Sequence, residues 1–353
     1  MHVEQIADNG EEVRLRVVAT ADEMTHAFTD GIDAFVEQYQ LEEFEGDTAS
    51  EKLIAAFGEE EAQPALYSAV INFLVPFALE EYGVAPLSTY GIESDDEPDQ
   101  DKPYSFEMTV LLKPEFELTN YEPATVSIDP VPTVSDEDIE AQMLMLARQV
   151  AAAQQGKDPQ DTTLELPAIT DAWVNDVLKP MGMQVDSVEE LRQCFKDTST
   201  EELMRRYEQE KMDRAMQEYV QRLDGSASPK MVDAMTQELY ETFLAELARD
   251  GMTFEAFAQS QNMTEDEVRT SLAQQATYQL MQGFVLDAIF RHEKLELGIG
   301  DLMAAIRNIA PGREDETFDA MQKTGRGFLL KEGAARMKAA EWVMNNTTFV
   351  VGE

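Results

Sequence analysis

The chain has 353 residues, of which 43% are hydrophobic, and its 27 Lys and Arg against 70 Asp and Glu give a formal net charge of −43. This length and apolar content allow two domains with cores of their own and exclude general disorder. Affinity for nucleic acid and for anionic membranes depends on Lys and Arg contacts to phosphate, so neither is expected as a partner.

The first 120 residues are expected to form a small α+β domain. Alternation of Val13, Leu15 and Val17 with other residues predicts a half-buried strand. Apolar spacings of three and four predict helices over 21–39, 51–57 and 62–82. The pattern returns to a strand over 105–116. A strand, helices and a strand are typical of an α+β domain.

A linker is expected over 121–165, first extended and rich in proline and then helical. Its helix is predicted to begin at Ser135, because Ser135 with Asp138 three residues later has the pattern of a capping box. From 166 to 353 the periodicity predicts an all-α domain with helices over 187–223, 229–249, 253–260, 264–292, 300–309 and 317–345. The helices could form a bundle or projecting arms, and the chain as a whole is expected to be mainly α.

Four segments resemble, in the same order, parts of trigger factor, the bacterial chaperone at the ribosomal tunnel exit. They are 112–118 (LKPEFEL), 133–139 (TVSDEDI), 166–173 (LPAITDAW) and 263–269 (MTEDEVR). The resemblance implies an N-terminal domain at 1–120, a linker at 121–165 and a helical, substrate-cradling domain at 166–353. It also implies that unfolded or nascent polypeptides are the partners.

Two departures from the family pattern change what the resemblance implies. The family docks on the ribosome through a basic loop, whereas the corresponding positions here are Phe44, Glu45, Gly46 and Thr48, and only the Phe is kept. Like charge against ribosomal RNA predicts weak or absent ribosome binding. The family also has an FKBP-type prolyl isomerase domain before the Leu-Pro segment, where this chain has only 151–165. That domain is therefore expected to be absent.

Residues that could support catalysis are few and scattered. His2, His26 and His292 lack the spacing that metal ligands need, and Cys194 has no histidine near it in sequence to act as a base. Gly325-Arg326-Gly327 lacks the spacing of a phosphate-binding loop. We therefore expect no enzyme activity, cofactor or metal. One cysteine and an N-terminus without a signal-peptide pattern predict a cytoplasmic protein.

Methionine is abundant in the helical region, where its flexible side chain suits a surface that binds varied apolar shapes. Apolar residues at helical spacing make candidate client contacts, namely Met204, Tyr207, Met216, Tyr219, Met231, Met235 and Phe243. The alternative is that most of them pack against one another as core.

The function predicted from these observations is that of an ATP-independent holdase for unfolded chains. The first alternative is an acidic adaptor for basic proteins, which would explain the charge without exposed apolar surface. A second is a family member that retains prolyl isomerase activity. A periplasmic SurA-type chaperone has similar helical features but would need an export signal.

Overall fold

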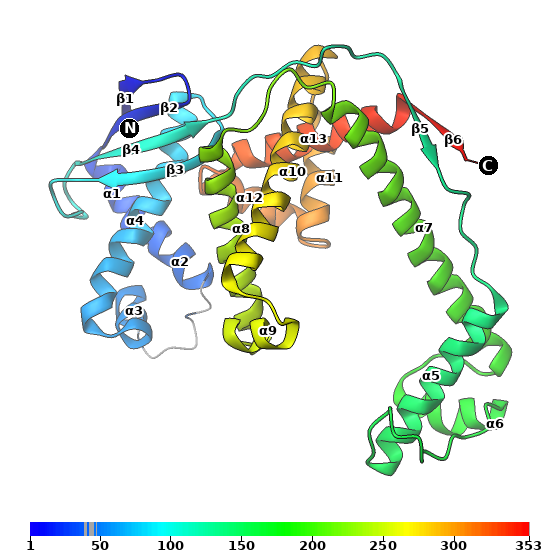
Figure 1. Ribbon diagram of the computed structural model, residues 1–353. Helices are drawn as coiled ribbons and strands as arrows, with labels where there is room; N and C mark the ends of the chain where they lie inside the picture. Colours follow the sequence, from blue (N-terminus) through cyan, green and yellow to red (C-terminus); the bar gives the residue numbers. More distant parts are fainter. Residues whose placement is uncertain (39–40, 42–45, 47, 353) are drawn as a thin grey trace. The chain divides into compact units, whose positions relative to one another are not determined.

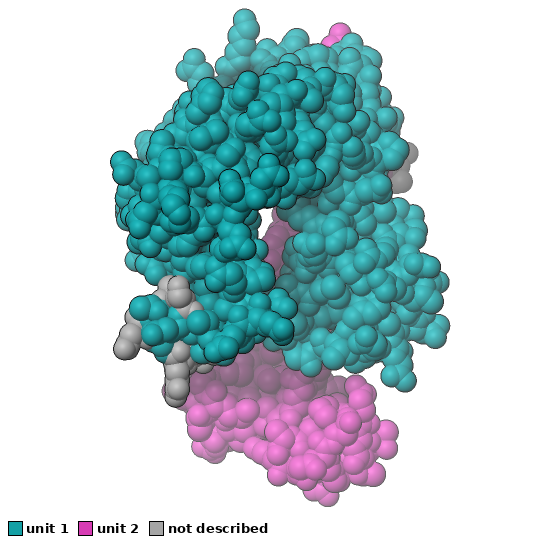
Figure 2. All heavy atoms as spheres, turned by 90° about the vertical axis from the view of Figure 1, so that its left-hand side faces the viewer, with its two compact units in different colours: residues 1–121, 219–342 teal, residues 122–218, 343–353 magenta. Residues whose placement is uncertain are grey.

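The computed structural model describes the whole chain except residues 39–40, 42–45, 47 and 353. These residues form two compact units, each built from two stretches of chain (Figure 2). Unit 1 contains residues 1–121 and 219–342, and unit 2 contains residues 122–218 and 343–353. The expected architecture, mainly α with a small N-terminal α+β region, is confirmed. The domain boundaries at 120 and 165 stay a prediction.

The N-terminal part of unit 1 has a four-stranded antiparallel sheet in the order β1-β2-β4-β3 (Figure 1). Its strands are β1 (His2–Asp8), β2 (Glu12–Ala19), β3 (Pro86–Glu93) and β4 (Tyr104–Leu112). Two strands are not predicted from the sequence: β1, whose burial pattern does not alternate cleanly, and β3, which contains Pro86 and Gly91. The strand expected over 105–116 ends at Leu112, because Pro114 has no N–H for a ladder.

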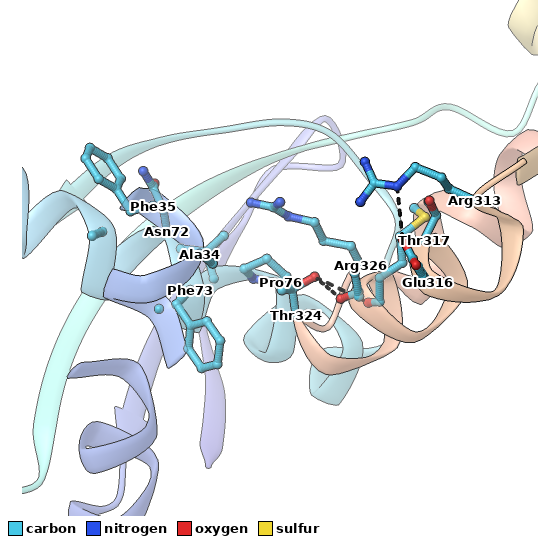
Figure 3. A pocket seen from close by; sticks show the side chains of 15 residues that line it. Ala34, Phe35, Asn72, Phe73, Pro76, Arg313, Glu316, Thr317, Thr324 and Arg326 are labelled. Atoms are coloured by element: carbon cyan, nitrogen blue, oxygen red, sulfur yellow. Dashed lines mark hydrogen bonds and ion pairs between the residues drawn. The ribbon is translucent and has the colours of Figure 1, made fainter. Parts of the chain in front are cut away.

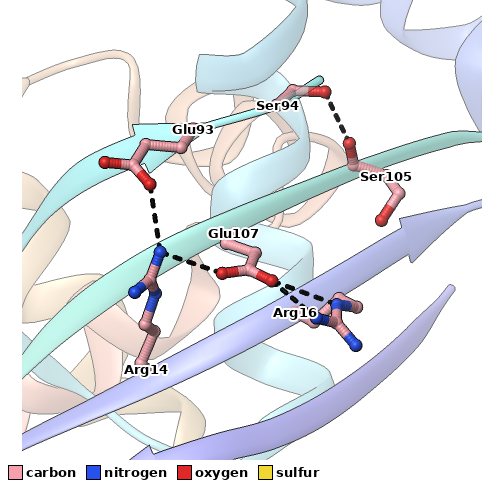
Figure 4. Close-up of polar contacts among 6 residues, drawn as sticks. All are labelled: Arg14, Arg16, Glu93, Ser94, Ser105 and Glu107. Atoms are coloured by element: carbon pink, nitrogen blue, oxygen red, sulfur yellow. Dashed lines mark hydrogen bonds and ion pairs between the residues drawn. The ribbon is translucent and has the colours of Figure 1, made fainter. Parts of the chain in front are cut away.

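One face of this sheet is covered by the N-terminal helices, and the other carries ion pairs but is covered at one end, where Leu111 is buried with Met231 of α8 (Pro229–Arg249) and Phe284 of α10 (Glu265–His292). On the covered face Val13, Leu15 and Val17 of β2 are fully buried with Phe106 and Met108 of β4. On the other face the Arg14 guanidinium lies 3.0 Å from carboxylate oxygens of both Glu93 and Glu107, and Arg16 lies 2.7 Å from Glu107 (Figure 4). The strict alternation of β2 therefore separates an apolar core from a ladder of exposed ion pairs.

The covering helices are α1 (Ala21–His26), α2 (Ile32–Gln38), α3 (Ala49–Phe57) and α4 (Glu59–Tyr82). The single helix expected over 21–39 is interrupted by a π-helical segment at Ala27–Gly31. Gly31 lets this segment approach α4, since a Cβ there would lie 2.8 Å from the Cβ of Phe73. By length and composition α4 could span a membrane, and it is the one such helix in the described part of the chain. Half of its apolar window is buried, and core helices meet the same criterion.

The C-terminal part of unit 1 is helical. Its helices are α8 (Pro229–Arg249), α9 (Phe254–Gln261), α10 (Glu265–His292), α11 (Ile299–Ile309), α12 (Glu314–Lys323) and α13 (Gly327–Asn345). The bounds expected for α8 are confirmed, and α8 and α10 pack side by side as a hairpin with α9 at one end (Figure 1). The single helix expected over 317–345 is wrong, because Gly325 has a left-handed φ of +68° and separates α12 from α13.

Unit 2 contains α5 (Asp136–Gln155), the short α6 (Asp171–Trp173) and most of α7 (Val188–Val220). Its core joins Ile139 and Met143 of α5 to Trp173, Leu178 and Leu191. The unit also has a two-stranded parallel sheet of β5 (Ala124–Ile128) and β6 (Thr347–Val351), with Ala124 opposite Thr347. The expectation that 166–353 is all α is thus corrected by β6, whose run of Thr and Val favours a strand.

Candidate functional site

A pocket of about 680 Å³ lies in unit 1 between the N-terminal helices and the turn from α12 to α13 (Figure 3). One wall comes from the π-helical segment, α2 and α4, and the other from α12 and the turn that follows it. The lining residues are Gly31, Ala34, Phe35, Ala69, Asn72, Phe73, Val75, Pro76, Arg313, Glu316, Thr317, Ala320, Met321, Thr324 and Arg326.

Two glycines bring the walls of this pocket close to α4. Gly31 packs on Phe73, as described above, and a Cβ on Gly325 would lie 2.9 Å from Cδ1 and 3.0 Å from the backbone nitrogen of Phe77. The α12–α13 turn thus contacts the α4 backbone directly, which no larger residue would permit without movement. Close contact at these two points places an apolar surface of α4 opposite the polar residues of α12.

Proline adds a backbone acceptor to the α4 wall. Pro76 lies inside α4 and has no N–H, so the carbonyl of Asn72 cannot receive the usual helical hydrogen bond from the residue four positions later. Asn72 and Pro76 both line the pocket. The α4 wall therefore contains, beside apolar side chains, a residue whose carbonyl has no helical donor.

The opposite wall is cationic in an otherwise acidic chain. Arg313 Nε donates to a carboxylate oxygen of Glu316 at 3.0 Å. Among the described residues, the Arg326 side chain has no ion-pair or hydrogen-bond partner, and it extends across the pocket toward the wall that contains Ala34 and Asn72 (Figure 3). Two guanidinium groups against one carboxylate leave this pocket with a net positive charge.

This pocket is not predicted from the sequence, in which Gly325-Arg326-Gly327 is only a poor match to a phosphate-binding loop. The available signal was local: a glycine at a helix break, directly before an arginine, in a strongly acidic chain. Nothing in the periodicity of the sequence indicates that residues near 313–326 lie against α2 and α4.

A second apolar surface lies at the end of the hairpin formed by α8, α9 and α10. The Phe243 ring lies 5.0 Å from that of Phe257 and 6.5 Å from that of Phe254, centroid to centroid. All three side chains are half-buried, and Met252 in the same turn is 41% exposed. We call Phe243, Phe254 and Phe257 the tip cluster. Aromatic rings left partly in water at the end of a hairpin offer apolar area to another chain.

Polar contacts fix the hairpin below the tip cluster. The Tyr240 hydroxyl donates to a Glu265 carboxylate oxygen at 3.1 Å, and the Arg269 guanidinium lies 3.7 Å above the Tyr240 ring. Burial and the hydrogen bond to Glu265 raise the pKa of Tyr240, while the hydrogen bond from Arg269 lowers the pKa of Glu265. These contacts join α8 to α10 and hold the tip cluster on a supported element.

The structure distributes the candidate client residues over both units. Four of the seven are buried: Tyr207, Met216, Tyr219 and Met231. Tyr207 packs with Met204 against β5 and β6, Tyr219 contacts Trp342, and Met231 packs with Met235 against α10. A buried side chain cannot contact a client without rearrangement, so these four serve packing in the folded chain. Met204, Met235 and Phe243 are half-buried and remain candidate client contacts.

Two of the four loop residues singled out from the sequence, Phe44 and Glu45, lie outside the described residues. Gly46 is exposed. Thr48 is the N-cap of α3: its hydroxyl accepts from Glu51 N at 3.2 Å, while the Glu51 carboxylate accepts from Thr48 N at 3.0 Å. The threonine thus has a local role that a lysine, which is a donor only, could not fill.

Both the N-terminal and the C-terminal part of the chain match models of known protein families. Residues 1–146 match the model of the bacterial trigger factor protein, and residues 187–345 match the model of the trigger factor C-terminus. Together they leave out residues 147–186 and 346–353. A solved structure described as "Promiscuous Substrate Recognition in Folding and Assembly Activities of the Trigger Factor Chaperone" aligns with 98% of this chain and 99% of its own, at a TM-score of 0.36 and 13% identity.

Curated relatives agree with the family models. The trigger factor of Agathobacter rectalis is 24% identical over 52% of this chain and 40% of its own length. That of Thermobifida fusca is 24% identical over 51% and 39%, and that of Pediococcus pentosaceus is 28% identical over 60% and 49%. The chain therefore spans less than half the length of these relatives. With two family models covering most of its residues, this chain belongs to the trigger factor family.

Proposed function

We propose that this chain is an ATP-independent chaperone that holds non-native polypeptides on apolar surfaces of unit 1. The observation that supports this most is the tip cluster, three aromatic side chains left half-buried at the end of the α8–α10 hairpin. Family membership supports a role in protein folding. Unit 1 is also visibly hollowed, with its own atoms on both sides of the opening (Figure 2).

The mechanism is binding through several weak contacts. Each half-buried aromatic removes some apolar surface of the client from water, and no single contact dominates, so exchange is fast. Sequestering exposed apolar segments prevents them from meeting one another and aggregating. The net charge of −43 keeps the loaded complex soluble by repulsion between complexes. Release is passive and follows the folding of the client.

The test is light scattering of a chemically unfolded client diluted with and without this protein. Equimolar protein is expected to suppress the scattering, and suppression should persist at about 0.5 M salt, where charge interactions are screened. A Phe243→Ser/Phe257→Ser variant is expected to lose about half of the suppression or more, because aromatic anchors dominate such contacts. The matched control is Gln259→Ser, an exposed polar position on α9 that should behave as wild type.

The acidic adaptor is the second candidate, and the charge of −43 favours it. If suppression disappears at high salt, or occurs only with basic clients, the adaptor replaces the holdase. If the tip-cluster variant suppressed aggregation as well as the wild type, the hairpin would not be a client-binding surface. A proline-limited refolding assay tests the isomerase alternative, and we expect no acceleration.

Ribosome docking is a separate proposal. Residues 42–47 contain four carboxylates and no Lys or Arg, so we propose that the chain does not bind ribosomes at physiological salt. Repulsion between these carboxylates and RNA phosphate is about 1 kcal/mol or more per close pair at reduced dielectric. Co-sedimentation with purified ribosomes is expected to leave the protein in the supernatant, and recovery in the ribosomal pellet would contradict the proposal.

A further inference from the structure

We propose that the pocket between α4 and the α12–α13 turn binds the C-terminal residue of a polypeptide, with its free carboxylate on Arg326 and its large apolar side chain against α4. This inference rests on the proposed function only in taking a polypeptide as the ligand. The proposed site lies in a part of unit 1 distinct from the tip cluster. It selects an anionic group, whereas the overall negative charge of the chain favours basic ligands.

The anionic group of the ligand follows from Arg326. A guanidinium is a planar fork of donors that matches a carboxylate bidentately, and it stays charged at every physiological pH. Among the described residues the Arg326 side chain has no partner, although acidic residues outnumber basic ones by 70 to 27 in the chain. Figure 3 shows this guanidinium extended over the pocket, where an incoming carboxylate could meet it.

The apolar part of the ligand follows from the opposite wall. Phe35, Phe73, Val75 and Pro76 present aromatic and aliphatic surface, and Met321 adds an adaptable side chain from α12. The volume of about 680 Å³ lies within the range of about 300–1,000 Å³ that is usual for ligand pockets. It admits a large side chain together with the adjoining backbone.

The peptide nature of the ligand follows from Asn72. Asn72 lines the pocket and its carbonyl lacks the helical donor that Pro76 cannot supply, so we assign it a peptide N–H of the ligand, a group that a fatty acid does not have. A chain terminus also joins the carboxylate and the apolar side chain on one residue, so one pocket can hold both. An internal Asp or Glu carries its carboxylate on a different residue from the apolar side chain.

The experiment measures binding of two fluorescent peptides by anisotropy. They have the same eight residues and end in Phe, one with a free carboxylate and the other with a C-terminal amide. The wild type is expected to bind the acid about five- to tenfold more tightly than the amide, the range of one charge-assisted pair. Arg326→Gln is expected to bind both peptides as the wild type binds the amide.

The matched control is Lys331→Gln, which removes one exposed positive charge from α13, outside the pocket. It is expected to keep the preference for the acid, which excludes a general effect of net charge. Equal binding of the acid and the amide by the wild type would overturn the proposal. A preference that Arg326→Gln retains would overturn it as well.

Two further probes separate the sources of the carboxylate. Decanoate should not displace the acid peptide at concentrations well above that of the peptide, and efficient displacement would make the site one for fatty acids. An amide-ended peptide with Glu before the final Phe should bind like the plain amide, and binding like the free acid would assign the site to acidic side chains. The aggregation assay with the tip-cluster variant does not involve Arg326, so the two proposals can fail independently.

Discussion

Helices α4 and α8 are similar in length and differ in how much of their surface they bury. Eight of the 24 residues of α4 are buried in the N-terminal core, whereas α8 buries two of its 21 residues and α9 none. Burial stabilises by about 25 cal/mol per Å² of apolar surface, so α4 contributes more to the stability of unit 1 than α8 and α9 do. The aromatic side chains of the tip cluster stay half-buried on α8 and α9, where the proposed client can reach them.

The largest expected effect tests this contrast by truncating one aromatic in each region. Phe106 is 1% exposed beneath the N-terminal helices, and Phe106→Ala is expected to lower the free energy of unfolding by about 3–5 kcal/mol. Phe243 is half-buried, and Phe243→Ala is expected to lower it by about 1 kcal/mol. Urea denaturation followed by circular dichroism measures both.

In the aggregation assay the order of the two effects should be reversed, with the larger loss of suppression in Phe243→Ala. Phe243→Ala is expected to weaken suppression at temperatures where it stays folded, and Phe106→Ala to weaken it only as far as it unfolds. If Phe243→Ala destabilised the chain as much as Phe106→Ala, the tip cluster would be a core and the contrast would fail.

A smaller effect is expected where the turn between α12 and α13 packs on α4. Gly325→Ala forces an L side chain into a left-handed backbone and places its Cβ within 3.0 Å of Phe77. Gly312→Ala has a similar φ of +83°, with nothing within 4 Å of the added Cβ. We expect about 1–2 kcal/mol of destabilisation from the backbone alone in the control and clearly more in Gly325→Ala. Thermal denaturation of both variants decides this, and equal losses would show that the turn does not pack tightly on α4.

The smallest effect concerns the ion pair that joins the sheet to α8. A hydrogen bond from Lys230 holds the pKa of Glu12 below its ordinary value of 4.5, against an opposing effect of burial. A carboxylate with a lowered pKa stabilises the fold above its unfolded pKa and loses that contribution as the pH falls through the folded value. The free energy of unfolding of Glu12→Gln should therefore fall less than that of the wild type below pH 4.5. If the urea midpoints of the variant and the wild type fell equally with pH, Glu12 would not contribute to the loss of stability in acid.

Local signals in the sequence predicted much of the fold. The capping box at Ser135 marks a helix start in the structure, the helix expected over 264–292 is found as α10, and the bounds of α8 follow from a proline after Ser228 and from its periodicity. Strand β1 was missed because little of it is buried, and the helix break at Gly325 because periodicity continues on both sides. The burial of Tyr219 and Met231 was weighed as an alternative, but burial depends on which helices pack together.

The pocket could not be predicted for a related reason. Its two walls are separated by more than two hundred residues of sequence, and neither wall alone contains a recognisable motif. Arg326 is informative only once it is known to face α4. The role of Thr48 was equally hidden, because comparison with a basic loop drew attention to the missing charge rather than to the cap that replaces it.

The pairing of β5 with β6 has a consequence for the order of events during synthesis. Ala124 pairs with Thr347, so the partner of β5 is made more than two hundred residues after β5 itself. Contacts between residues so distant in sequence form slowly, since the intervening chain must be closed into a loop. The N-terminal sheet needs only the first 112 residues and can fold while the rest is being made. Strand β5 must wait, and until β6 arrives the newly made chain carries an unpaired strand of the kind that a chaperone protects in other proteins.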